Sequence, residues 1–224
     1  MPAQELKTTP PSDDASLVDD VYHQILLRII HQELPGGTEL KSTRLAADMG
    51  VSRTPVVQAL GRLAADGIVM QQRNHRAVVR ENAENWLVEL HELRLLLEPS
   101  AAGRAATRIP DAVLDELEQL ATAANPDSNP NWMQASRQFD YALHHAVAEY
   151  VENLPLCEAI RKCWSFKRLS YDAGQDTEET LRNGYEDHLH IMKAFRLRSP
   201  EMAEAAMRWH LQHAASWGAG SRIV

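Results

Sequence analysis

The feature that most constrains the fold is the helical pattern that fills the larger, C-terminal part of the chain. Beyond Val79, apolar residues recur at three- and four-residue spacing, with no alternating apolar strands and no glycine-rich phosphate loop. Breaks such as Ile109-Pro110-Asp111 and Ser199-Pro200 divide this part into segments. The segments lie near 84–107, 110–124, 130–150, 153–172, 176–198 and 200–217. They predict an antiparallel helix bundle over 81–218, followed by a tail over 219–224.

The N-terminal part begins with a segment that has no periodic pattern. Residues 1–16 are rich in Pro, Ser, Thr and Asp, which predicts a flexible arm. Apolar residues from Val18 to Ile29 then recur at helical spacing. This first helix is expected to end near Leu34-Pro35-Gly36-Gly37, where proline and glycine interrupt the pattern.

Two shorter helices and a hairpin are expected next. Thr43–Met49 predicts a short helix closed by Gly50, because glycine suits the left-handed position after a helix end. A further helix opens at Ser52, whose hydroxyl can cap it, and runs to Asp66-Gly67. Short β-like runs follow on either side of a polar, basic tip, at 68–70 and 77–79.

This order of elements predicts a mainly α protein with a winged helix-turn-helix at residues 17–80. The net charge of −8 argues at first sight against a nucleic-acid partner, but the charge is segregated. Residues 41–80 hold seven basic and two acidic residues, whereas 81–224 hold 14 basic and 22 acidic residues. A basic module joined to an acidic one indicates two tasks in one chain.

In a helix-turn-helix, the start of the second helix enters the major groove of DNA. Arg53 can offer a bidentate fork to guanine, and Ser52 or Thr54 can bond a phosphate or a base edge. Basic residues near the preceding helix suit phosphate contacts, and the wing tip suits the minor groove. The further candidate DNA-binding residues are Lys41, Thr43, Arg44, Arg73, His75 and Arg76.

The segment from Leu40 to Val79 contains LAADMGVSRTPVVQALGRLAADGIV. It resembles the winged helix of GntR-type bacterial transcription regulators, most specifically in SRTPV followed by AL, RL and DGIV. The resemblance implies DNA binding. Three positions depart from the family pattern: Val57 replaces an arginine, Arg44 is displaced by one position, and Arg76 replaces the wing glycine. These departures concern the operator sequence and the affinity.

A second constellation consists of one carboxylate and three imidazoles. Asp140 and His144 are four residues apart, so they share one helix face. His188 and His210 each lie eleven residues from Ser199, so an antiparallel hairpin brings them to the same level. Such ligands suit zinc first, or nickel, manganese or iron. The alternative is hydrogen-bonded core histidines, and His145, His190 and His213 are nearby.

Residues 84–217 resemble the helical effector domain of the FadR subfamily in its metal-binding version. The matching pieces include Glu92-Leu93-Arg94 with Glu98-Pro99, Asn153, and the surroundings of the four residues just named. The resemblance implies that Asp140, His144, His188 and His210 bind a divalent metal, and that Arg94 contacts a small carboxylate effector. The alternative for Arg94 is an ion pair with Glu98 within the helix.

These patterns predict a transcription regulator rather than an enzyme. The expected protein is a repressor that binds a pseudo-palindromic double-stranded operator as a homodimer and responds to a small organic acid. Alternatives are a regulator for which the metal ion is the signal, or a metal-dependent hydrolase. A cytoplasmic location is expected, because no apolar run approaches the length of a membrane span and the N-terminus lacks a secretory pattern.

Overall fold

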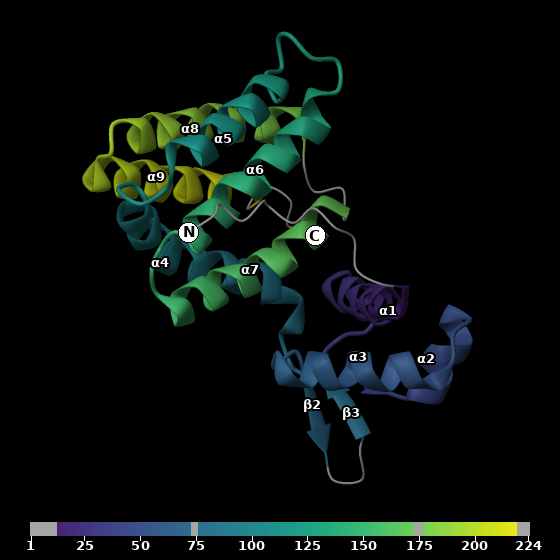
Figure 1. The fold of residues 1–224 in the computed structure, drawn as a ribbon. Coiled ribbons are helices and arrows are strands. Elements are labelled where there is room, and N and C mark those ends of the chain that lie inside the picture. The colour runs from purple at the N-terminus through teal and green to yellow at the C-terminus, as the bar shows by residue number, and fades with distance from the viewer. Residues whose placement is uncertain (1–12, 73–75, 173–176, 219–224) are drawn as a thin grey trace. The chain divides into compact units, whose positions relative to one another are not determined.

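The computed structural model describes residues 13–72, 76–172 and 177–218. The chain divides into two compact units, Met1–Trp86 and Leu87–Val224 (Figure 1). The expected boundary lay at residue 80. The difference arises because the 3₁₀ helix η1 (Ala83–Asn85) packs against the first helix, with Ala83 buried.

Unit 1 is a winged helix-turn-helix, as the sequence predicts. Its helices are α1 (Asp13–Ile30), α2 (Ser42–Met49) and α3 (Arg53–Ala65). The strands β1 (Glu39–Leu40), β2 (Val69–Gln72) and β3 (Arg76–Val79) form an antiparallel sheet in the order β1-β3-β2. In Figure 1, β2 and β3 form the hairpin beside α3.

The core of unit 1 forms where α1 packs on α3. Ile25, Leu26 and Ile29 of α1 and Val56 and Leu63 of α3 are at most 1% exposed. These residues recur at the spacing that gives one apolar helix face. Burying that face fixes the orientation of α3, and therefore of its polar N-terminus.

Several local details of unit 1 differ from expectation. Helix α1 begins at Asp13, inside the expected arm. It ends at Ile30, before the proline, since Gln32 adopts a positive φ of 59°. Ser52 is the N-cap residue of α3, but its hydroxyl makes no capping hydrogen bond. Gly50 closes α2 with φ 67°, as predicted.

In the residues that the structure describes, unit 2 consists of helices joined by turns and loops, with no strand. Its helices are α4 (Trp86–Ala105), α5 (Asp111–Ala123), α6 (Trp132–Glu149), α7 (Leu154–Asp172), α8 (Glu178–Arg196) and α9 (Pro200–Gly218). Each lies within two residues of a segment expected from the sequence, because proline marks most of the breaks. The shared core includes Phe139, Leu143, Ile160, Ile191 and Phe195, all fully buried.

Helices α8 and α9 form the hairpin that brings distant histidines together (Figure 1). The turn is closed by Ser199 N–H, which donates to Ala194 O at 3.2 Å, and by Arg198 with φ 51°. The Arg198 side chain anchors the turn, since Nη2 donates to Asp111 Oδ1 at 2.5 Å and Nη1 donates to Ile109 O. Within the described part of the chain, no helix is long and apolar enough to cross a membrane.

Candidate functional site

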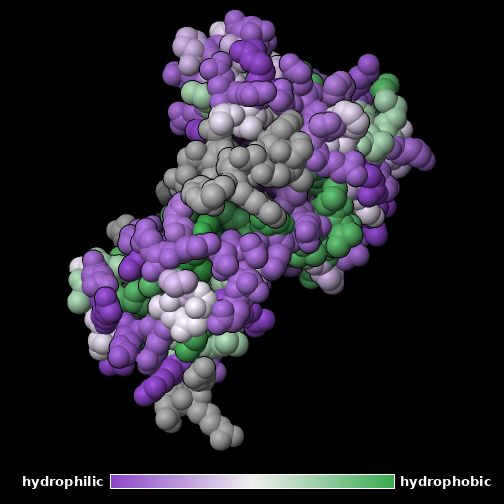
Figure 2. Space-filling model, turned by 180° about the vertical axis from the view of Figure 1, so that it is seen from behind, coloured by the Kyte–Doolittle hydropathy of each residue, from purple (hydrophilic) through white to green (hydrophobic). Residues whose placement is uncertain are grey.

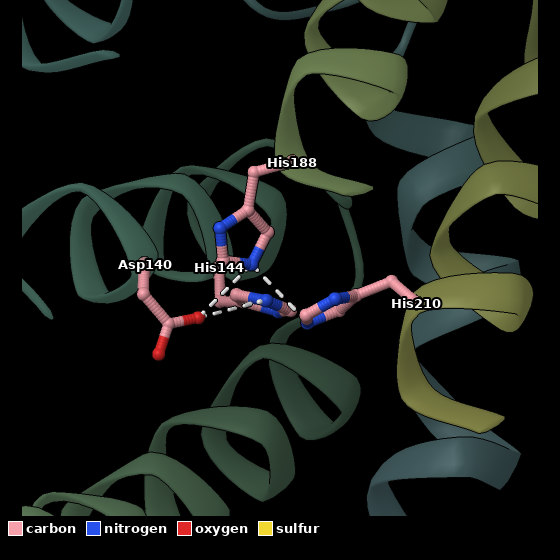
Figure 3. Close-up of side chains that lie close together, drawn as sticks. All are labelled: Asp140, His144, His188 and His210. Carbon is pink, nitrogen blue, oxygen red and sulfur yellow. Dashed lines mark hydrogen bonds and ion pairs between the residues drawn. The ribbon is translucent and has the colours of Figure 1, made fainter. Parts of the chain in front are cut away.

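The four predicted metal ligands meet inside unit 2. Asp140 and His144 project from α6, His188 from α8 and His210 from α9 (Figure 3). One ligand atom from each lies within 4.8 Å of those of the other three. The structure therefore brings together residues that are as many as 70 positions apart in the sequence. His145, His190 and His213 do not belong to this cluster.

The ring nitrogens of the cluster converge through their Nε2 atoms. His188 Nε2 lies 3.1 Å from Asp140 Oδ1 and 3.2 Å from His210 Nε2. His144 Nε2 lies 3.4 Å from the same Asp140 oxygen. Three nitrogen donors and one carboxylate oxygen thus surround a common point, which is the arrangement that a four-ligand metal site requires.

Burial and neighbouring groups shift the pKa values of two histidines and the aspartate of this cluster. His144 is fully buried and His210 is 5% exposed, and burial lowers the pKa of both imidazoles. Burial would favour the neutral acid at Asp140, but the hydrogen bond and charge of His188 prevail and lower its pKa. Neutral imidazoles and an ionised carboxylate are the forms that bind a metal ion.

The donor set fits a divalent metal ion. His144 Nε2 is buried and makes no hydrogen bond within the described residues, so its lone pair is available. Imidazole and carboxylate ligands suit zinc, nickel, manganese and iron, and this set contains no thiolate. The coordination geometry alone does not select one metal among these.

Glu98 of α4 forms a second layer behind the cluster, which the sequence patterns did not reveal. Its Oε2 accepts a hydrogen bond from His144 Nδ1. Its Oε1 accepts from Arg94 Nε at 2.6 Å and from Trp164 Nε1 at 3.1 Å. Burial opposes ionisation of this carboxyl, yet Arg94 and His144 lower its pKa to about 2. The contact with His144 spans 46 residues, so only the tertiary fold reveals it.

Arg94 forms the ion pair with Glu98 that was the alternative to an effector contact. Both side chains are almost completely buried, and the guanidinium lies 4.3 Å from the Trp164 ring centroid. Its Nη2 is buried and has no hydrogen-bond partner among the residues described. The ion pair with Glu98 thus leaves part of the hydrogen-bonding capacity of Arg94 unused. A buried guanidinium donor without a hydrogen bond lowers the free energy of unfolding, so a ligand that accepts from it would be favoured.

The candidate DNA-binding residues lie on the surface of unit 1. Ser52, Arg53 and Thr54 are exposed at the start of α3, and Arg53 Nε donates to Ser42 Oγ at 3.0 Å. Exposed Val57 follows one turn later on the same helix. The first turn of α2 and the residue before it expose three further candidates, Lys41, Thr43 and Arg44.

The wing contributes one candidate within the described residues. Arg76 is exposed on β3, with its Nε 3.6 Å from Glu39 Oε1 of β1. This exposed pair contributes little to stability and leaves the guanidinium accessible. Arg73 and His75 lie outside the described residues.

Comparisons with known proteins agree with this division of the chain. Residues 17–79 match the family described as "Bacterial regulatory proteins, gntR family", and residues 89–213 match the FCD domain. The Nta operon transcriptional regulator of Aminobacter aminovorans is 27% identical over 176 residues, which cover 79% of this chain and 82% of the relative. The transcriptional repressor NanR of Edwardsiella tarda is 26% identical over 226 residues, covering 91% and 85% respectively.

A solved structure supports the same fold. E. coli McbR/YncC aligns with a TM-score of 0.62 at 22% identity, over 92% of this chain and 97% of that one. A winged helix joined to an FCD helical domain defines a class of bacterial DNA-binding regulators. The chain belongs to the GntR family and carries the FCD type of C-terminal domain. The gntR family model describes bacterial regulatory proteins and both relatives are named as transcription regulators, which agrees with the expectation of a regulator rather than an enzyme.

Proposed function

We propose that this protein is a transcriptional repressor that binds its operator as a homodimer and responds to a small organic acid held beside a divalent metal. The observation that carries the proposal is the buried cluster of Asp140, His144, His188 and His210 in a chain whose other unit exposes the start of a recognition helix. The relatives named above regulate transcription, which supports the same conclusion. We place its action in the cytoplasm.

The metal would be held by the three Nε2 atoms and the Asp140 carboxylate, with zinc as the first choice. When bound, it would supply a Lewis-acid position for a carboxylate oxygen. Arg94 is the residue best suited to the rest of the acid, because a guanidinium recognises carboxylates by two parallel hydrogen bonds. Its unpaired Nη2 leaves one such donor available.

That unpaired donor favours the organic acid over the metal ion alone as the signal. A pure metal sensor requires the four ligands, but it gives no role to a buried arginine donor that has no partner within the described ranges. A ligand can change operator affinity only by binding one conformation of the dimer better than the other. We propose that the acid weakens operator binding, so that its presence relieves repression.

A homodimer is proposed because a two-fold operator matches a two-fold protein. The visible face of the molecule in Figure 2 is mainly hydrophilic, with apolar side chains gathered in limited areas. In unit 2, Leu96 of α4 is 76% exposed and Val88 is 63% exposed. Exposed leucine and valine on one helix are consistent with a contact between subunits.

The proposal can be tested with an operator duplex obtained by selection from random DNA. Fluorescence anisotropy would measure its affinity for metal-loaded protein, chelator-stripped protein and His188→Ala, each with a panel of small carboxylic acids. We expect at least one acid to weaken operator binding of the metal-loaded protein and to have no effect on His188→Ala. Operator affinity that follows metal concentration and ignores every acid would instead establish the metal as the signal.

A further inference from the structure

Glu98 joins two groups that the proposed function uses separately. One of its oxygens accepts from Arg94 Nε at 2.6 Å, and the other accepts from His144 Nδ1. Glu98 has no exposed surface, and Arg94 and His144 are 3% and 0% exposed. A single buried carboxylate on α4 therefore connects the arginine to a candidate metal ligand on α6.

The hydrogen bond to Glu98 fixes which nitrogen of His144 faces the cluster. An ionised carboxylate only accepts hydrogen bonds, so Nδ1 must carry the proton. In a neutral imidazole the lone pair then lies on Nε2, the nitrogen that faces Asp140 at 3.4 Å. The hydrogen bond to Glu98 also fixes the orientation of the His144 ring. This ring packs against the Trp164 ring, with centroids 4.5 Å apart.

Among the described residues, the other two imidazoles lack an equivalent partner. His210 Nδ1 lies 3.7 Å from Asp187 Oδ2, which is too long for a hydrogen bond. His188 Nδ1 is buried and has no hydrogen-bond partner in the part of the chain that is described. His144 is thus the ligand whose orientation depends most on a specific side chain outside the cluster.

We propose that Glu98 is a positioning residue of the metal centre, which holds His144 with Nε2 toward the other ligands and ties the Arg94 guanidinium to that ligand. This inference rests on the proposed metal site. It assigns to α4 a function in metal binding, although α4 contributes no ligand. Outer-layer carboxylates of this kind typically change metal affinity about 10–100-fold when they are lost.

The test compares two replacements of Glu98 in the full chain. Glu98→Gln keeps an oxygen acceptor and loses the charge, whereas Glu98→Leu removes the acceptor at similar volume. Glu92→Gln is the matched control, because it loses the same charge from an exposed position on the same helix. The Zn²⁺ affinity of each chelator-stripped protein is measured by competition with a chromophoric chelator.

We expect Glu98→Leu to weaken Zn²⁺ binding about 100-fold, Glu98→Gln about 10-fold, and Glu92→Gln less than about twofold. Nitrogen-15 NMR of the metal-free proteins gives an independent measure, the tautomer of His144. The wild type and Glu98→Gln should show a protonated Nδ1, and Glu98→Leu should show a mixture of tautomers. A purely structural function of Glu98 would leave the tautomer unchanged.

Glu98→Leu leaves Arg94 buried without its partner, which can prevent folding. The double variant Arg94→Met with Glu98→Leu removes both charges. We expect it, like Glu98→Leu, to bind Zn²⁺ about 100-fold more weakly and to show a mixture of His144 tautomers. Zn²⁺ affinity of either variant within about twofold of wild type, or an unchanged His144 tautomer, would overturn this inference alone. A wild type that binds no divalent metal would overturn the proposed metal site together with it.

Discussion

Removal of one imidazole should abolish a large metal-dependent gain in stability. His188 links Asp140 and His210 through contacts of 3.1 and 3.2 Å, so the metal would join α6, α8 and α9 of unit 2. A ligand that binds only the folded state at 100 times its dissociation constant stabilises that state by about 2.7 kcal/mol. For a domain of this size, that corresponds to an increase in Tm of about 10 °C. We expect this increase in wild type and not in His188→Ala.

The assay is calorimetric unfolding of chelator-stripped protein with and without excess Zn²⁺. His145→Ala is the control, because His145 lies beside His144 on α6 but outside the cluster. It should retain the full increase in Tm. Stabilisation of His188→Ala by Zn²⁺ to the same extent as wild type would show that the ligand set is wrong.

Three further predictions concern pH, helix stability and DNA binding. Because burial lowers the pKa of His144 and His210, the unfolded chain binds more protons than the folded protein below about pH 6.5. The unfolding free energy of the metal-free protein should therefore fall as the pH decreases from about 6.5. Urea titrations at pH 7.5 and 5.5 measure this change, and equal unfolding free energies at the two pH values would contradict it. Gly61→Ala should raise the unfolding free energy of unit 1 by about 0.5–1 kcal/mol, because glycine destabilises a helix interior relative to alanine. A Cβ at this position meets no atom within 4 Å, so no clash opposes the gain. A lower Tm for the variant in thermal unfolding would contradict this prediction. Arg53→Ala should weaken binding to the selected operator by about 1–3 kcal/mol and relax specificity at one base pair, whereas an equal loss on every sequence would identify Arg53 as a phosphate contact.

The sequence predicts the helix positions, and the pairing of the candidate ligands along and across helices, because both depend on local pattern. Proline and glycine mark the helix ends, and the equal distances of His188 and His210 from the turn at Ser199 bring them to one level. The i, i+4 spacing places Asp140 and His144 on one face. Helix geometry thus related the residues within each of two pairs, whereas the choice of these four as one ligand set rested also on the resemblance to the FadR subfamily.

Features that depend on tertiary contacts were not predictable in the same way. The bond between Glu98 and His144 joins helices that are distant in the sequence, and no periodicity reports it. Strand β1 has two residues, Glu39 and Leu40, which is too short to show alternation, and it forms only by pairing with β3. The expected capping hydrogen bond between the Ser52 hydroxyl and the first turn of α3 is not formed. Residue type identifies the N-cap position, but the orientation of the side chain decides whether the bond forms.

Sequence-specific binding of DNA by a two-fold dimer is the central requirement of the proposed function. The decisive measurement is selection of the purified, metal-loaded protein on a random duplex library at fixed salt, followed by sequencing of the retained DNA. We predict enrichment of an inverted repeat whose half-sites are about 10 base pairs apart or a multiple of that spacing. Retention without an enriched repeat, or no retention at all, would contradict the account.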